Sequence, residues 1–140
     1  MPSDTSEARL VLALVDDLPT GLTVNAGALL GISLGRLFPD VVGHDVTDAS
    51  GVVHPGISTR TVPVLKASAE RLAHLTGKAR ATPGVTAVDV TDTAQRARTY
   101  DDYARQLADG PTETHRVLGL ALHGPGSAIR SLTGDLPLYR

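Results

Sequence analysis

Several absences narrow what this chain of 140 residues can do. It has no cysteine, which excludes thiol catalysis, zinc–thiolate sites and iron–sulfur clusters. Its longest apolar run, Leu10 to Val15, is far shorter than the ~20 residues of a membrane-spanning helix, so we expect no membrane partner. The first nine residues contain no apolar core of a secretory signal, and the cytoplasm is the expected compartment.

Positive charge and aromatic rings are also scarce. The 13 Lys and Arg do not exceed the 15 Asp and Glu, and aromatic residues make up 3% of the chain. A protein that follows nucleic-acid phosphates usually has a basic surface. We therefore expect no nucleic-acid partner, except tRNA if the chain is a peptidyl-tRNA hydrolase.

The remaining composition is that of a globular protein, with 41% hydrophobic and 20% charged residues. The length fits one domain, and about two thirds of the unfolded surface would be buried on folding. We expect residues 1–8 to form a flexible tail and residues 9–140 to form a single α/β domain.

Apolar patterns predict strands and helices in alternation. Continuous or alternating apolar residues indicate strands at 10–15, 61–65, 85–90 and 116–123. Apolar residues at three- and four-residue spacing indicate helices at 22–38, 68–80, 101–108 and 128–133. Asp48 to Gly51 is typical of a hairpin turn, and Pro63 favours an edge position for the second strand. This order predicts a three-layer α/β/α sandwich around a four-stranded, mixed or mostly parallel sheet.

Two stretches resemble the type 2 peptidyl-tRNA hydrolases. The chain as a whole is more similar to bacterial proteins grouped as domain of unknown function 2000, which share that fold. The matching segments are 16–25, 48–56, 63–66, 94–100 and 117–138. The resemblance implies a fold of the peptidyl-tRNA hydrolase type.

The catalytic pattern of those hydrolases is not conserved in this chain. Their first helix carries Gly-x-Gly-Lys-x-Ala-Ala-Gln-x-x-His, and when Gly21 is aligned with the first glycine the three polar positions fall on Val24, Ala28 and Gly31. These side chains can neither orient a water molecule nor stabilise an oxyanion. The resemblance therefore implies the fold without the standard hydrolase residues.

Polar residues at the end of the first strand are candidates for a pocket. Asp17 ends this strand, Gly21 lies in the following turn, and Asn25 is the first strongly polar residue of the next helix. Ligands of α/β sheets commonly bind beyond the carboxyl ends of strands. Asn25 could donate to an oxyanion or a carbonyl oxygen, and Asp17 could accept a proton. The plainer alternatives are helix capping and contact with solvent.

Two histidines complete the predicted pocket. His123 ends the last strand and lies near Asp17 and Asn25 if the tips of the first and last strands meet. His54 belongs to a His-Pro-Gly turn that could reach over the same opening. The plainer alternative for each histidine is a half-exposed structural residue. The spacing of His44, Asp45 and His54 does not fit a compact metal site, so we expect no metal and no cofactor.

Three functions remain open. The first is binding of a small polar or acidic ligand by Asp17, Gly21, Asn25, His54 and His123. The second is hydrolysis of peptidyl-tRNA or another amide or ester, in which Asn25 holds the oxyanion and His123 or Asp17 activates water. The third is a structural or partner-binding domain. Glycines at 27, 31 and 35 on an uncharged helix also indicate a packed face, and hence a possible homodimer.

Overall fold

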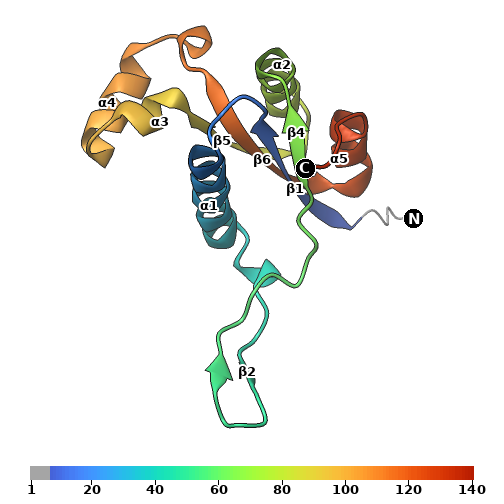
Figure 1. Cartoon of the computed structure of the whole chain (residues 1–140). Helices are drawn as coiled ribbons and strands as arrows, with labels where there is room; N and C mark the ends of the chain where they lie inside the picture. The colour runs from blue at the N-terminus through green and yellow to red at the C-terminus, as the bar shows by residue number, and fades with distance from the viewer. Residues whose placement is uncertain (1–6) are drawn as a thin grey trace.

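The structure is a computed structural model that describes residues 7–140, and its centre is a four-stranded sheet in the order β4-β1-β6-β5. The strands are β1 (Ala8–Val15), β4 (Val64–Ala67), β5 (Thr86–Thr91) and β6 (Val117–Pro125). β1 runs parallel to β4 and antiparallel to β6, and β6 runs antiparallel to β5 (Figure 1). The prediction of a mixed four-stranded α/β sheet is confirmed.

The two central strands are buried on both faces. Val11, Ala13 and Val15 of β1 enter one hydrophobic core, and the alternate residues Leu10, Leu12 and Leu14 enter the other. Because successive side chains of a strand point to opposite faces, a strand between two cores must be apolar at every position. This burial explains the uninterrupted apolar run in the sequence.

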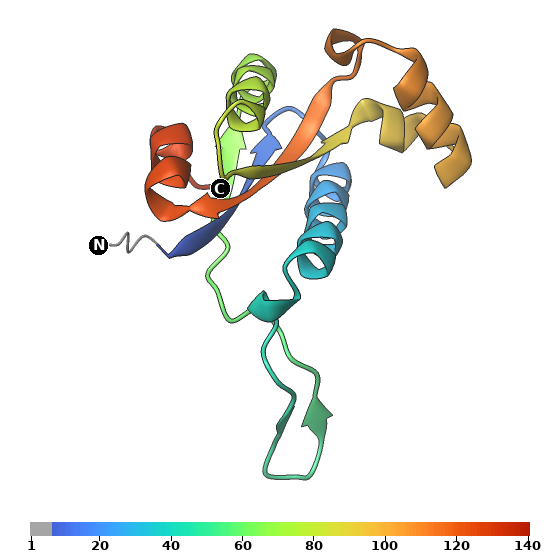
Figure 2. The same cartoon turned by 180° about the vertical axis from the view of Figure 1, so that it is seen from behind.

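Helices cover both faces of the sheet unequally. One helix, α1 (Thr20–Leu37), packs on one face through Ala26, Leu30 and Leu34. Two helices, α2 (Ala69–Arg80) and α5 (Gly126–Thr133), pack on the other (Figures 1 and 2). The Ser68 side chain caps α2 by accepting the N–H of Arg71. The face under α1 therefore has less cover than the face under α2 and α5.

A helical segment links β5 to β6 and projects from the side of the sheet (Figure 2). It comprises α3 (Asp92–Arg96), α4 (Tyr100–Asp109) and the short helix η2 (Thr112–Thr114). His115 anchors it: Nε2 donates to the carbonyl oxygens of Leu107 and Gly110 at 3.0 and 3.1 Å, and Nδ1 accepts from Thr93 at 2.7 Å. This histidine therefore has a structural role.

The segment 42–59, here called the arm, extends away from the sheet after η1 (Pro39–Val41) (Figure 1). Its strands β2 (Val46–Thr47) and β3 (Val53–His54) form a short hairpin. Asp48 accepts the N–H groups of Ser50 and Val52, and Gly51 has φ +87°. The hairpin turn predicted at Asp48 to Gly51 is thus confirmed. No residue of the arm is buried.

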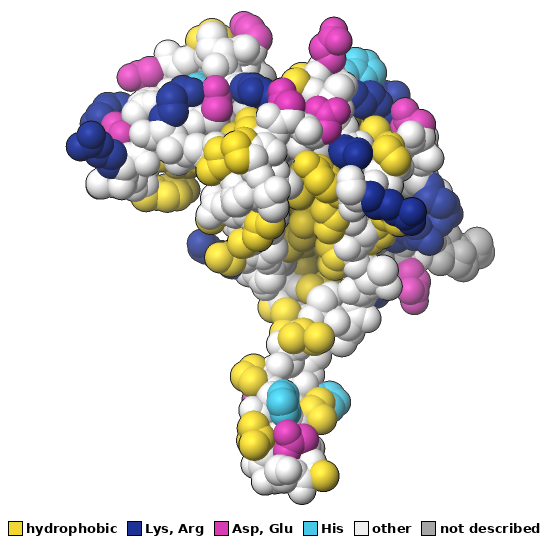
Figure 3. All heavy atoms as spheres, in the orientation of Figure 1, with side chains coloured by type: hydrophobic (Ala, Val, Ile, Leu, Met, Phe, Trp, Pro, Cys, Tyr) yellow, Lys and Arg dark blue, Asp and Glu magenta, His cyan; other side chains and the backbone are white. Residues whose placement is uncertain are grey.

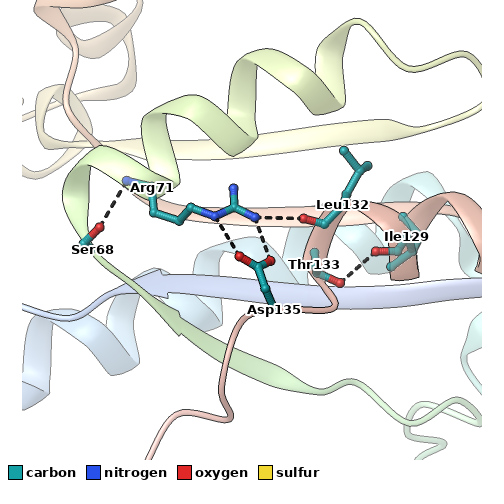
Figure 4. A network of polar contacts seen from close by, with 6 residues as sticks. All are labelled: Ser68, Arg71, Ile129, Leu132, Thr133 and Asp135. Atoms are coloured by element: carbon teal, nitrogen blue, oxygen red, sulfur yellow. Dashed lines mark hydrogen bonds and ion pairs between the residues drawn. The ribbon is translucent and has the colours of Figure 1, made fainter.

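The C-terminal segment covers the outer edge of β4. Lys66 donates its N–H to Pro137, and Tyr139 donates its N–H to Val64. Arg71 of α2 orients the start of this segment. Its guanidinium group donates to the Asp135 carboxylate at 2.8 and 3.4 Å and to the Leu132 carbonyl at 3.2 Å (Figure 4). Arg71 also lowers the pKa of the Asp135 carboxyl. Covering an edge strand removes a site for unwanted strand pairing.

Several predicted boundaries differ from those of the structure, and two of these differences concern the strands β4 and β1. The second predicted strand, 61–65, is found three residues later, as β4 at Val64–Ala67. Proline cannot donate to a ladder, so Pro63 precedes the strand, where its carbonyl accepts the N–H of Leu12. Of the predicted tail 1–8, residues 1–6 lie outside the described residues, and Ala8 already belongs to β1.

We expect the arm to be structurally independent of the core. A Cβ on Gly56 would overlap the carbonyl group of Gly43 at the base of the arm, so Gly56→Ala should open the arm. Because no arm residue is buried, this substitution should change the melting temperature by less than ~2 °C. Limited proteolysis and thermal unfolding measure the two effects.

Gly77→Ala is the matched control, because a Cβ there meets nothing within 4 Å. This substitution inside α2 should stabilise the protein by about 0.5–1 kcal/mol without exposing the arm. A large loss of global stability in Gly56→Ala would show instead that the arm and the core unfold together.

Candidate functional site

Asp17 lies just beyond the end of β1 and is already paired. Its carboxylate accepts from the guanidinium of Arg116, which precedes β6. The ion pair joins the end of β1 to the start of β6. Asp17 is largely exposed, with 55% of its side chain accessible.

Gly21 and Asn25 lie in the first half of α1, and both are exposed. Nothing lies within 4 Å of the position where Gly21 would carry a Cβ. Val24, Ala28 and Gly31, the positions aligned above with the polar residues of the hydrolase pattern, are exposed on the same helix. The outer surface of α1 therefore carries no polar side chain at these three positions.

His123 is found at the other end of the sheet. It pairs in register with Leu10 near the start of β1, and its ring stacks on Phe38 with centroids 3.6 Å apart. Burial lowers the pKa of His123, and the positive charge of Arg60 lowers it further.

His54 lies in the arm, where Nε2 contacts the Asp48 carboxylate at 2.8 Å. This contact is the main cause of a lowered pKa of Asp48. Both side chains are substantially exposed.

The pocket expected from the sequence is therefore not assembled. Because β6 runs antiparallel to β1, its last residues lie beside the first residues of β1. Asp17 and His123 are separated by at least the length from Leu10 to Val15, about 17 Å at ~3.4 Å per residue. Asp17, Gly21 and Asn25 share one end of the molecule, His123 lies at the opposite end, and His54 lies on the arm.

A different cavity, of about 670 Å³, opens at the start of β1. We call it the arginine cavity, because three of its lining side chains are arginines from three separate segments. Its lining residues are Glu7, Ala8, Arg9, Leu10, Val11, Thr59, Arg60, Thr61, Pro63, Gly126 and Arg130.

The incomplete pairing of β1 forms this cavity. β4 joins β1 only from Leu12 onward, so the first half of β1 has no partner strand on that side. Leu12 donates its N–H across this edge to Pro63, and the N–H of Leu10, two residues earlier, therefore points in the same direction. The cavity thus has a backbone donor in its wall.

The charge of the arginine cavity is positive. Arg60 donates to the Ala8 carbonyl at 3.0 Å and to Glu7 at 3.3 Å. Within residues 7–140, Arg9 and Arg130 form no ion pair with a carboxylate. The stem of Arg9 packs beside Gly126, since a Cβ there would lie 3.5 Å from its Cγ and Cδ. Three arginines and one carboxylate residue, Glu7, thus line the cavity.

Sequence reasoning missed these arginines because they form no local motif. Arg9 is the second residue of β1, Arg60 lies in a loop, and Arg130 lies in the last helix. One sign was visible: a charged residue directly before the apolar run Leu10 to Val15 indicates an edge or an end of the sheet.

Metal ligands and membrane spans give no further candidates. Among residues 7–140, no group of three or more His, Asp or Glu side chains could hold a metal ion. In the same part of the chain, no helix has both the length and the apolar character needed to cross a bilayer.

Comparison with known proteins assigns the chain to a family. The model of the family described as "Protein of unknown function (DUF2000)" matches residues 8–140. The chain belongs to the DUF2000 family. It is similar in structure to the protein of unknown function Atu0240 from Agrobacterium tumefaciens strain C58, with a TM-score of 0.89 and 17% identity over 96% of this chain and 98% of that one. A search of the curated proteins found no match.

The lowered pKa of His123 predicts a pH-dependent stability. The unfolded chain binds a proton here more readily than the folded chain does. The free energy of unfolding should therefore fall as the pH drops below ~6.5, the ordinary pKa of histidine. Above that pH the folded protein should keep the full stability contributed by neutral His123. His123→Phe keeps a ring beside Phe38 and should flatten this dependence.

Urea unfolding at pH 7.5 and pH 5.5 measures the effect. His74→Gln, at an exposed position of α2, is the control and should behave like the unmodified chain. An equal loss of stability in His123→Phe and the unmodified chain would contradict the prediction.

Proposed function

We propose that this DUF2000 protein binds a small acidic ligand in the arginine cavity. The observation that carries the proposal is the convergence of Arg9, Arg60 and Arg130 on one hollow that contains a single carboxylate, Glu7. Neighbouring positive charges repel one another, and this repulsion costs free energy. A bound anion offsets that cost.

The chemistry of the lining favours a carboxylate or a phosphate. Guanidinium groups donate two parallel hydrogen bonds to such anions. The Leu10 N–H and the hydroxyl group of Thr61 add neutral donors. The hydroxyl group of Thr59 already donates to the Val41 carbonyl at 2.9 Å. A volume of about 670 Å³ lies in the usual range of ~300–1,000 Å³ for small-molecule sites.

The same lining favours binding over hydrolysis. It contains no histidine, and its one carboxylate, Glu7, already accepts from Arg60. A general base that activates water needs a free acceptor near its target. The alternative of an amide or ester hydrolase using Asn25, Asp17 and His123 stays a prediction, and no contact among those three residues supports it.

We further propose that the fold is of the type 2 peptidyl-tRNA hydrolase kind, with the catalytic positions lost. Helices on both faces of a mixed four-stranded sheet support this proposal. So does the position of Val24, Ala28 and Gly31 on the outer surface of the first helix. The family would then have kept the architecture and moved its binding site to the start of β1.

Arginine substitutions test the ligand site directly. Arg9→Gln and Arg130→Gln should each weaken the binding of citrate or inorganic phosphate roughly tenfold, because each removes a charge-assisted hydrogen bond. Isothermal titration calorimetry at low and high salt measures the affinity.

Arg98→Gln is the matched control for these variants. It removes the same charge from the loop between α3 and α4, outside the arginine cavity. It should leave the affinity unchanged. Equal weakening in all three variants would reveal only a general effect of net charge and would overturn the site.

His123 offers a second, independent readout. The charge of Arg60 lowers the pKa of His123, and an anion bound beside Arg60 would offset that charge. Saturating citrate should therefore raise the pKa of His123, as measured by NMR titration of its ring protons. In Arg60→Gln the pKa should start higher and no longer respond. An unchanged pKa in the saturated protein would place the anion elsewhere.

A further inference from the structure

The outer surface of α1 is unusually apolar for a helix in contact with water. Within α1, Arg36 is the only charged residue. Val24 is 65% exposed and Ile32 is 71% exposed. A helix that covers a sheet normally turns charged and polar residues toward solvent. We call this surface, with exposed Leu22, Val24, Leu29, Ile32 and Leu37, the α1 face.

An apolar groove runs beside the first half of the α1 face. α1 packs on β1, β5 and β6, which leaves the same side of β4 without a helix. The groove has a volume of about 500 Å³ and is lined by Leu12, Leu14, Val24, Val64 and Tyr139. Figure 3 shows hydrophobic side chains gathered in this hollow beside α1.

The arm carries apolar side chains with nothing to cover them. Val46, Val52 and Val53 are each more than half exposed, and Ile57 is 81% exposed. Figure 3 shows hydrophobic side chains along the arm. A two-stranded hairpin without a core beneath it is only marginally stable in water. An arm of this kind is stabilised when its apolar side chains reach a second surface.

We propose that these three features meet in a homodimer. In this dimer α1 packs antiparallel on the α1 of a second copy, and each arm lies in the apolar groove of the other copy. The proposal does not rest on the acidic ligand, because the arginine cavity shares no residue with the α1 face or the groove and shares only Thr59 with the arm.

The order of the elements favours a second copy as the occupant. The arm follows the C-terminal end of α1, whereas the groove lies beside its N-terminal half, at Thr20, Thr23 and Gly27. An antiparallel crossing places the C-terminal end of each α1, from which the arm departs, beside the N-terminal half of the other copy's α1, where the groove lies. One chain thus carries both an apolar projection and a matching apolar hollow, as a two-fold interface requires.

Charge and shape at the crossing also fit two identical surfaces. When two copies of a charged surface pack together, each charge must lie beside an opposite charge. The α1 face has no charged residue between positions 18 and 35, so two copies of it can pack there without such pairing. At Gly31 and Gly35 nothing lies within 4 Å of a would-be Cβ. Two helices can therefore approach closely beside Ile32.

The area available matches what a stable dimer needs. With 18 residues, α1 is ~27 Å long and ~10 Å wide, and so offers ~270 Å². The arm, ~30 Å long and ~10 Å wide, offers ~300 Å², and the surface that receives the partner's arm offers as much again. The total of ~870 Å² per copy compares with ~800 Å² in standard interfaces. The helix alone would fall short, so the arm is essential.

Ile32→Glu tests the helix crossing. Analytical ultracentrifugation of the full chain should show a dimer, and this substitution should raise its dissociation constant roughly 30-fold or more, because it places two carboxylates at the crossing. Ala73→Glu adds the same charge to the exposed surface of α2 and should leave the dimer intact. Thermal unfolding checks that both variants fold.

The arm is tested with Val46→Ser and Val53→Ser together. Both side chains are more than half exposed, so the monomer should fold normally while the dimer weakens roughly tenfold or more. A chain that stays monomeric at ~100 µM, or a dimer that is unaffected by Ile32→Glu or by the double serine variant, would overturn the proposal.

The absence of native cysteine allows a test that does not depend on affinity. Ile32→Cys should form an intermolecular disulfide under mild oxidation, because a crossing at this position brings the two sulfur atoms within bonding reach. Ala73→Cys should not. A disulfide that forms equally in both variants, or in neither, would exclude the proposed arrangement.

Discussion

The antiparallel pairing of β1 with β6 is the constraint on which the rest of this structure depends. These two strands form the middle of the sheet, and their side chains supply about half of the buried residues of the two cores. Neither strand can shift by one residue without moving leucines and valines from one core to the other. Their register therefore determines which loops meet at each end of the sheet.

The two proposed binding surfaces arise where this scaffold is incomplete. β4 pairs with only the second half of β1, and the uncovered first half becomes a wall of the arginine cavity. On one face of the sheet a single helix covers what two helices cover on the other, and an apolar groove remains beside α1. In both places the backbone or side chains of the central sheet are within reach of a ligand or a partner.

The family assignment agrees with this division between a preserved frame and variable surfaces. The similar structure of Atu0240 has 17% identity and a TM-score of 0.89. A frame of this kind tolerates extensive substitution when each strand keeps its apolar character and each helix its inward face. The positions occupied by Val24, Ala28 and Gly31 are outside that requirement. They can change in polarity without disturbing either core.

The sequence alone determined most of the strands and helices and a four-stranded α/β sheet, because these depend on local patterns such as the apolar run Leu10 to Val15 and the turn at Asp48. It left open whether the sheet is mixed or mostly parallel. The sequence also determined that most of α1 is uncharged, because no charged residue occurs between Asp17 and Arg36. Only the tertiary structure decided which residues share a site. His123 was expected beside Asp17, but the direction of β6 places it near Arg60 instead. Arg9, Arg60 and Arg130 come together across more than a hundred residues of chain. No local pattern encodes such a meeting, because strand direction is set by the packing of the whole sheet.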